Sequence, residues 1–383
     1  MQVAHLVKTK SLKSDGRVIK WINSLYEMGV NSEVFTLEDA NIPKNYKEGT
    51  FNVSTTSLYS RKFFGKRKGY FLKIPEFTIR SLSFFKQSKS DIFVFHDVQH
   101  YLTLFWLCFF KKQNSKKKIV WDLHELPHGA LGKFAATRKI IQYILSKVDL
   151  IVYTNEYRRQ CILKIFPFKE GPFVILNNFP DKNYINAPLA ALPPELSEWN
   201  GNKPYILWMG AGSESRNFMS VLQSFQAWKE HLNLVVMGSV TKDMKRHISM
   251  NKLENHVYEK FVNQDDIIKY VDNAFFSIVF YKQTSLNNTF CEPNRLYQLI
   301  TRRIPVIVGN NPPLKSVVDQ YGAGFVLPDD GSNSATLLEA IDQMMQENTI
   351  KEIVTNLHAY AFDEGMSWEN QFSNVHGKLC LLR

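Results

Sequence analysis

Two histidines and three carboxylates follow two neighbouring apolar runs that are typical of buried strands. His96 and Asp97 close one run, and Asp122, His124 and Glu125 close or follow the next. Ligands bind outside the carboxyl ends of parallel strands, and imidazole with carboxylate can transfer protons or stabilise developing charge. We therefore predict that His124, His96 and Asp97 are catalytic. Asp122 and Glu125 are predicted to contact the substrate.

The same stretch, His124-Glu125-Leu126-Pro127-His128, also matches the H-E-x-x-H pattern of zinc hydrolases. In those enzymes both histidines lie one helical turn apart and bind zinc. Pro127 opposes a helix at this point, and no third ligand is evident downstream. We therefore expect no metal and no cofactor, and a zinc hydrolase remains an alternative that a metal assay would test.

A second candidate site lies in the loop before the first predicted helix. Gly16 would let a ligand approach the backbone, and Arg17 would meet an anion at the helix start. The alternative is that Asp15 caps the helix and Gly16 only turns the chain.

A third candidate is a loop of small residues that directly follows the predicted strand 205–209. Gly210 and Gly212 begin like a dinucleotide fingerprint, but Ser215 occupies the position of its third glycine. Such a loop leaves backbone N–H groups free at a helix N-terminus, and Arg216 adds a cation. The pattern predicts a pyrophosphate site.

The fourth candidate is the start of a helix predicted after Pro293, which is well placed to begin one. Glu292, Asn294 and Arg295 lie at this start, and Gln298 follows in the next turn. Arg295 is predicted to neutralise a phosphate. The alternative is a cation that is merely solvated at the surface.

The elements that must position these residues alternate along the chain. Strands are predicted at 3–7, 33–37, 92–95, 119–123, 150–153, 174–176, 205–209, 234–237, 257–261, 275–280, 305–308 and 324–327. Helical segments lie between them, which is typical of an α/β protein with parallel sheets covered on both faces. Prolines and glycines interrupt the alternation once, and we predict a first domain at 1–180, a linker at 181–204 and a second domain at 205–365. Two such domains facing each other across a cleft would form the active site there.

Composition excludes several protein classes. The chain has 383 residues, of which 44% are hydrophobic, so it can form a sizeable core and is not disordered. Its four cysteines are far apart, which excludes a disulfide scaffold and fits a reducing compartment. We expect no secretory signal, because Lys20 interrupts its apolar region. The longest apolar run, 101–110, is too short to span a membrane and is predicted to be a buried core helix.

Charge is unevenly distributed along the chain, whose net charge is +11. Residues 1–180 hold 29 Lys/Arg and 14 Asp/Glu, a net of +15, whereas residues 181–383 hold 18 and 22, a net of −4. The segment 61–68 mixes five basic residues with Phe63 and Phe64, a combination that anionic membranes attract. We predict membrane contact there, with a solvated basic face as the alternative. Nucleic acid is not expected, because no recognition motif accompanies the charge.

Taken together, these motifs resemble a GT-B glycosyltransferase, and most closely glycosyltransferase family 4. The similarity covers nearly the whole chain. It is carried by "SDGRVIKWINSLYEMGVNSEVFTL", "DIFVFHD", "KIVWDLHEL", "VILNNFPD", "CEPNRLYQLITRRIPVIVGNNPPLKSVV" and "MSWENQF". The resemblance implies two Rossmann-like domains, with residues 366–383 forming a helix that crosses back to the first domain.

The resemblance also implies roles for individual residues. His124 matches the histidine near the anomeric carbon and phosphate of the donor, Arg216 a diphosphate-binding base, and Gly16 the loop near the donor phosphates. The family pairs two glutamates, whose positions are occupied here by Phe290 and Gln298.

A further difference from the family concerns a second diphosphate base, an arginine whose position is occupied by Ala211. We infer that Arg295 replaces the missing charge. Gln298 retains the ability to hydrogen-bond a ribose hydroxyl.

The predicted function is transfer of a sugar from a nucleotide-diphosphate-sugar donor to a glycan or lipid-linked acceptor in cell-surface polysaccharide assembly. The resemblance implies retention at the anomeric carbon. We expect a cytoplasmic protein bound peripherally to the inner face of the cell membrane. The alternative is a catalytically inactive GT-B subunit that supports a membrane glycan-assembly complex.

Overall fold

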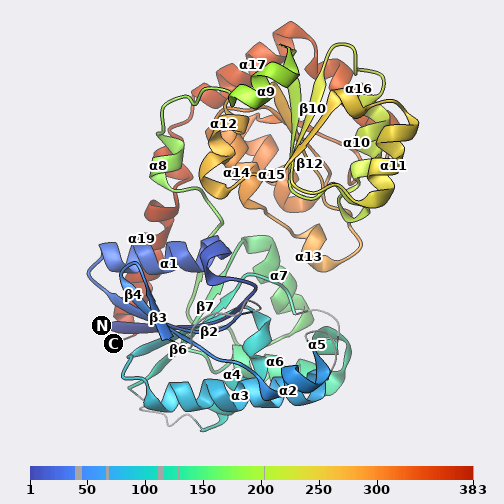
Figure 1. Cartoon of the computed structure of the whole chain (residues 1–383). Coiled ribbons are helices and arrows are strands. Elements are labelled where there is room, and N and C mark those ends of the chain that lie inside the picture. The colour runs from blue at the N-terminus through green and yellow to red at the C-terminus, as the bar shows by residue number, and fades with distance from the viewer. Residues whose placement is uncertain (39–44, 66–68, 111–115, 128–129, 202, 383) are drawn as a thin grey trace. The chain divides into compact units, whose positions relative to one another are not determined.

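The computed structural model describes residues 1–38, 45–65, 69–110, 116–127, 130–201 and 203–382 (Figure 1). The chain divides into two compact α/β units, Met1–Asn177 with Gln371–Arg383, and Asn178–Asn370. The predicted linker 181–204 is not a separate segment, because all of it belongs to the second unit. Its helices α8 (Lys182–Ile185) and α9 (Pro194–Asn200) contribute Ile185 and Leu196 to the apolar core of that unit.

The first unit contains an eight-stranded sheet in the order β3-β4-β2-β1-β5-β6-β7-β8. Its strands are β1 Gln2–Thr9, β2 Asn31–Glu38, β3 Asn45–Glu48, β4 Phe51–Thr55, β5 Ile92–His96, β6 Lys118–Leu123, β7 Leu150–Tyr153 and β8 Phe173–Ile175. Only β3 and β4 pair antiparallel within this sheet as described. These two strands were not predicted, because their short segments lack a continuous apolar run.

Among the described residues, eight helices lie wholly or mainly in this unit. They are α1 Gly16–Glu27, α2 Tyr59–Phe64, α3 Tyr70–Gln87, α4 Tyr101–Phe110, α5 Ala130–Lys133, α6 Ala135–Leu145, α7 Glu156–Ile165 and α19 Trp368–Leu381. The C-terminal helix α19 brings Phe372 edge-on against Trp21 of α1, with ring centroids 5.0 Å apart.

The prediction that 101–110 forms a buried core helix is wrong. Helix α4 packs against α3 and α6, but Trp106, Phe109 and Phe110 are 41, 58 and 69% exposed. The helix is apolar around its whole circumference, whereas its neighbours cover only part of it. None of the helices in the described residues is long and apolar enough to cross a membrane.

The second unit contains six parallel strands in the order β11-β10-β9-β12-β13-β14. They are β9 Tyr205–Met209, β10 Asn233–Met237, β11 Val257–Lys260, β12 Phe276–Val279, β13 Val306–Val308 and β14 Gly324–Val326. All six lie where the apolar runs predicted them. The α/β class and the two Rossmann-like domains are therefore confirmed.

Helices surround the sheet of the second unit (Figure 1). Besides α8 and α9 they are α10 Phe218–Phe225, α11 Lys242–Met250, α12 Ile267–Val271, α13 Leu286–Thr289, α14 Asn294–Thr301, α15 Pro312–Tyr321, α16 Ser334–Met344, α17 Glu347–His358 and α18 Phe362–Gly365.

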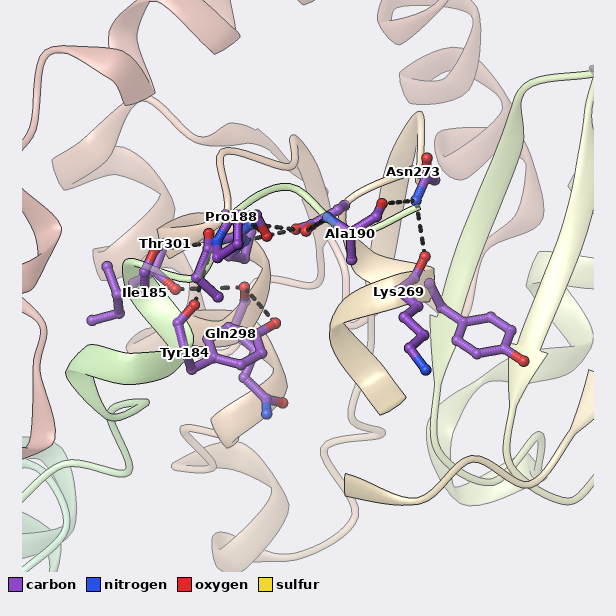
Figure 2. A network of polar contacts seen from close by, with 12 residues as sticks. Tyr184, Ile185, Pro188, Ala190, Lys269, Asn273, Gln298 and Thr301 are labelled. Carbon is purple, nitrogen blue, oxygen red and sulfur yellow. Dashed lines mark hydrogen bonds and ion pairs between the residues drawn. The ribbon is translucent and has the colours of Figure 1, made fainter. Parts of the chain in front are cut away.

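A polar network fixes the start of the second unit to the end of α14 (Figure 2). Arg302, just beyond α14, forms a buried bidentate pair with Asp272, with both N–O distances 2.7 Å. It also donates to the carbonyls of Ile185 and Ala187 at 3.0 and 2.7 Å. The proline-rich stretch is therefore ordered by a buried arginine, which composition alone does not reveal.

Candidate functional site

The carboxyl ends of β5 and β6 bring one group of polar side chains together. His96 and Asp122 are register partners on these strands, and His96 Nδ1 lies 3.0 Å from Asp122 Oδ2. His124 Nδ1 is 3.8 Å from the same oxygen, and its Nε2 is 4.0 Å from Asp97 Oδ2. We call these four residues, with Arg17, the histidine cluster.

Within this cluster, His124 is the imidazole that reaches the surface. Its side chain is 27% exposed, whereas that of His96 is 1% exposed and hydrogen-bonded at both ring nitrogens. His96 was predicted to be catalytic, but its burial leaves it no access to a substrate. Its ring lies between that of His5 and the carboxylate of Asp122.

Asp97 has a strained backbone. Its φ of +70° is rare for a residue other than glycine. Two hydrogen bonds hold this conformation: its N–H donates to the Asp122 carbonyl at 2.8 Å, and its carbonyl accepts from Trp121 Nε1 at 3.1 Å. Such strain costs on the order of 1–3 kcal/mol and is concentrated at functional sites. It directs a carboxylate toward His124.

Arg17 is paired within the protein, which corrects the prediction that it meets a substrate anion. Its guanidinium donates to both Asp122 oxygens, at 2.7 and 3.0 Å, and to the Leu176 carbonyl at 3.1 Å. Asp122 was predicted to contact the substrate, but its side chain is fully buried. Burial opposes ionisation of Asp122, but Arg17 and the two histidines hold its pKa well below the usual range.

The N-terminus of α1 combines both interpretations of the opening loop. Asp15 caps the helix, accepting from the Val18 N–H at 3.4 Å. At Gly16 an added Cβ would meet no atom within 4 Å. The protein itself therefore does not require glycine there, and the backbone is open to a ligand.

The pKa of His124 is raised above its usual value. Burial lowers it, but Asp97 and Asp122 outweigh burial and the opposing effect of Arg17. Arg158 of α7 donates to the His124 carbonyl and fixes this part of the backbone. A partly exposed imidazole that favours its protonated form can donate to an oxygen that becomes negative during a reaction.

The zinc-helix alternative is wrong for the described residues. After β6 the chain is irregular from 124 to 127, so these residues do not form the helix that the zinc pattern requires. His128 lies outside the described residues. His96, Asp122 and His124 do offer potential ligand atoms within 4.8 Å of one another. However, Arg17 engages both Asp122 oxygens, and its charge would repel a cation. Glu125 is exposed.

The second unit carries a pair of arginines at the carboxyl end of β9. Both Arg216 and Arg295 donate to the Met209 carbonyl. Their guanidinium carbons lie over the Tyr281 ring, 5.3 and 4.7 Å from its centroid. Among the described residues, no carboxylate forms an ion pair with either of them. We call these two residues the arginine pair.

Arg295 is a buried cation, which excludes the alternative of a solvated surface residue. It is 7% exposed, and its Nε has no hydrogen-bond partner in the described structure. Burial lowers its pKa to about 10, with Tyr281 opposing this change and Arg216 reinforcing it. Buried charges are normally paired. An unpaired buried guanidinium beside a second one indicates a site for an anion.

The glycine loop does not work as predicted. The N–H groups of Gly210 and Gly212 donate to the carbonyls of Met237 and Ser239, at 2.8 and 2.9 Å, and are not free for a phosphate. Gly210 has a φ of +107°, and a Cβ there would clash with the Arg216 guanidinium. The absence of a side chain at Gly210 therefore leaves room for the arginine pair.

Helix α14 begins at Asn294, as predicted, and places Arg295 in the pair. Asn294 is exposed, whereas Glu292 and Gln298 are buried. The Gln298 carbonyl accepts from the Tyr184 hydroxyl at 3.3 Å (Figure 2). Tyr281 was not predicted, although it lies two residues after strand β12 and the carboxyl-end rule would have found it.

Residues 194–362 match the protein family described as glycosyl transferases group 1. No curated protein sequence matches the chain. Sucrose-phosphate synthase from Thermosynechococcus elongatus has a similar structure, with a TM-score of 0.71, 13% identity and 100% of both chains covered.

Two further structures are similar over the whole chain. One is a trehalose-6-phosphate synthase that was studied for the mechanism of glycosyltransfer with retention (TM-score 0.75, 10% identity, 100% of this chain and 99% of that chain covered). The other is an Anabaena protein in complex with UDP and glucose (TM-score 0.71, 11% identity, 100% of both chains covered). The chain thus has a GT-B fold, and its residues 194–362 match the glycosyl transferases group 1 family; together these findings indicate a nucleotide-sugar glycosyltransferase.

Proposed function

We propose that the arginine pair binds the diphosphate of a nucleotide-sugar donor. The observation that carries this proposal is that two guanidinium groups share one aromatic ring and one carbonyl without a carboxylate partner. A diphosphate supplies the missing negative charge in a form that guanidinium groups recognise well. Arg295 lies close to Gly210. The next residue, Ala211, occupies the position at which the family has its other diphosphate-binding arginine.

His124 is the proposed catalytic residue for transfer. In this role its protonated imidazole stabilises charge on the leaving group or positions the donor sugar, and Asp97 and Asp122 maintain its protonation. Retention at the anomeric carbon is part of the proposal and is supported by the likeness to the trehalose-6-phosphate synthase. The anomeric configuration of the product, read by proton NMR, tests it.

We further propose that the acceptor is glycan or lipid-linked and that the first unit binds an anionic membrane surface. Helices α2, α3 and α4 are neighbours and expose Phe63, Phe71, Trp106, Phe109 and Phe110. Basic residues of α2 accompany these aromatics. Aromatic insertion together with charge is what binds proteins to the surface of anionic bilayers. The basic residues at 66–68, within the predicted segment 61–68, lie outside the described residues.

Sedimentation with anionic and neutral vesicles tests the membrane proposal. Replacing Trp106, Phe109 and Phe110 together by serine should weaken binding to anionic vesicles at least tenfold, because burial of each ring stabilises binding by roughly 1.5–3 kcal/mol. Met250→Ser is the matched control, since Met250 of α11 is also exposed. Equal sedimentation of all three proteins would refute the membrane face. The proposed location at the inner face of the cell membrane and the proposed role in polysaccharide assembly both depend on this binding to an anionic membrane.

A thermal-shift screen with nucleoside diphosphates and nucleotide sugars tests the donor site. A ligand that prefers the folded state raises Tm, and we expect one nucleoside diphosphate to do so in wild type and in Arg246→Ala. Arg246 lies exposed on α11 and serves as the control. If none of these ligands shifts Tm, the arginine pair is not a donor site.

An inactive GT-B subunit is the second candidate. The observation that favours it is the replacement of the family's paired glutamates by Phe290 and Gln298. Both candidates predict nucleotide binding, so turnover of a bound nucleotide sugar separates them. Turnover by wild type that depends on His124 excludes the inactive subunit.

A further inference from the structure

A second buried histidine lies behind the histidine cluster. His5 of β1 is fully buried, and its Nδ1 lies 3.0 Å from Nε2 of His96. The two rings are stacked, with centroids 5.3 Å apart and planes 19° from parallel. Trp21 packs edge-on against both rings. His5 therefore begins a chain of contacts that runs through His96 to Asp122 and His124.

Proton placement in this chain follows from the partner at its far end. Asp122 is held ionised by Arg17 and can only accept hydrogen bonds. His96 must therefore carry a proton on Nδ1, which faces Asp122. When His96 is neutral, its Nε2 is an acceptor, and His5 must then donate from Nδ1. Burial disfavours a positive charge on His5 and lowers its pKa well below the usual value.

We propose that His5 is a positioning residue for the transfer reaction: its Nδ1–H donates to Nε2 of His96 and thereby holds the His96 ring with its Nδ1–H on Asp122. This inference rests on the proposed function, because it concerns the residues that orient His124. It assigns a role to a residue of β1 that lies outside the reach of substrate. Since His5 acts through His96 and Asp122, its loss should affect turnover and leave donor binding unchanged.

Two substitutions separate positioning from mere core packing. His5→Asn places an amide donor close to the position of the imidazole Nδ1, whereas His5→Leu fills the space without a donor. With a nucleotide-sugar donor that wild type turns over, His5→Leu should lower kcat about tenfold, the size expected for one positioning hydrogen bond, with donor KM unchanged. His5→Asn should keep most of the wild-type kcat.

The deciding readout is nitrogen-15 NMR of labelled histidines, which needs no turnover. In wild type we expect a neutral His96 that is protonated on Nδ1 and accepts a hydrogen bond at Nε2, and in His5→Asn the same state. In His5→Leu we expect the Nε2 signal of His96 to move downfield, because that nitrogen loses its hydrogen bond. A wild-type His96 that is protonated on Nε2 or is an imidazolium would overturn the proposal. So would unchanged His96 signals in His5→Leu, or equal loss of kcat in both variants. Absence of turnover in wild type with the expected NMR result would instead refute the proposed function.

Discussion

The histidine cluster and the arginine pair solve the problem of buried charge in opposite ways. In the first, the carboxylate of Asp122 meets Arg17 in a bidentate pair and two histidines close by. In the second, two guanidinium groups have no carboxylate partner within the described residues, and Arg295 is buried. Charges that are already neutralised orient one another, whereas charges without a partner require one from outside.

This contrast assigns different tasks to the two regions. Preorganised dipoles and charges stabilise a transition state without reorganising during the reaction, which suits the histidine cluster. Unpaired cations raise the free energy of the empty protein and gain most from an anionic ligand, which suits the arginine pair. Substitutions should therefore affect turnover in the first region and donor affinity in the second.

The largest expected effect is on turnover. His124→Ala should reduce kcat by about 100-fold or more, the size observed when one preorganised donor is removed. Nucleotide affinity should change little, because the arginine pair is intact, and Tm should stay close to that of wild type. Turnover, calorimetric affinity and Tm measured on the same preparation check this. A His124→Ala protein with full turnover, or one that loses activity only because it unfolds, would remove the catalytic assignment.

A buried histidine outside the histidine cluster extends this comparison to a ring that has no hydrogen-bond partner among the described residues. His100 is fully buried without partners for either ring nitrogen in the described structure, and burial chiefly lowers its pKa to about 3. The unfolded chain therefore binds a proton at this residue below about pH 6.5 that the folded protein excludes until about pH 3. Folding stability is lost as pH falls through this window.

Replacing His100 removes that loss. His100→Leu should retain about 2 kcal/mol more of its neutral-pH stability than wild type does on going from pH 7 to pH 5. Urea unfolding at both pH values measures it. The matched control is His231→Leu, at an exposed histidine of the second unit. Parallel pH profiles for wild type and His100→Leu would contradict the assignment.

The smallest expected effect concerns the strain at Asp97. Glycine accepts a φ of +70° without steric cost. Asp97→Gly should therefore raise the free energy of unfolding, or leave it unchanged within about 1 kcal/mol, while lowering turnover because His124 loses one carboxylate. Denaturant unfolding and turnover assays would show the two effects in opposite directions. A strongly destabilised Asp97→Gly protein would mean that the carboxylate serves the fold.

Sequence patterns predicted the sheets better than the contacts between side chains. Continuous apolar runs located twelve of the fourteen described strands, including β9 and β12, because central parallel strands are buried on both faces. The exposed face of α4 was missed, because composition does not show which side of an apolar helix is covered. Pairing of Arg17 with Asp122 was also missed, since 105 residues separate them.

The candidate residues illustrate the same limit. His124 and Arg216 follow strands and were found by the carboxyl-end rule. His5 lies inside a strand, where a histidine normally indicates only a buried core residue, and its importance depends on the register of β1 against β5. Local pattern thus identifies which residues reach an edge of the sheet, but not which of them are already neutralised by the fold.

Calorimetric titration of the nucleoside diphosphate that raises Tm most tests the central claim most directly. Wild type and the control Arg246→Ala should bind it equally well. Arg216→Ala should bind it more weakly by roughly 1.5–3 kcal/mol, the contribution of a hydrogen bond to a charged group. Unchanged affinity in Arg216→Ala, with all three proteins folded, would contradict the assignment of the arginine pair as the diphosphate site.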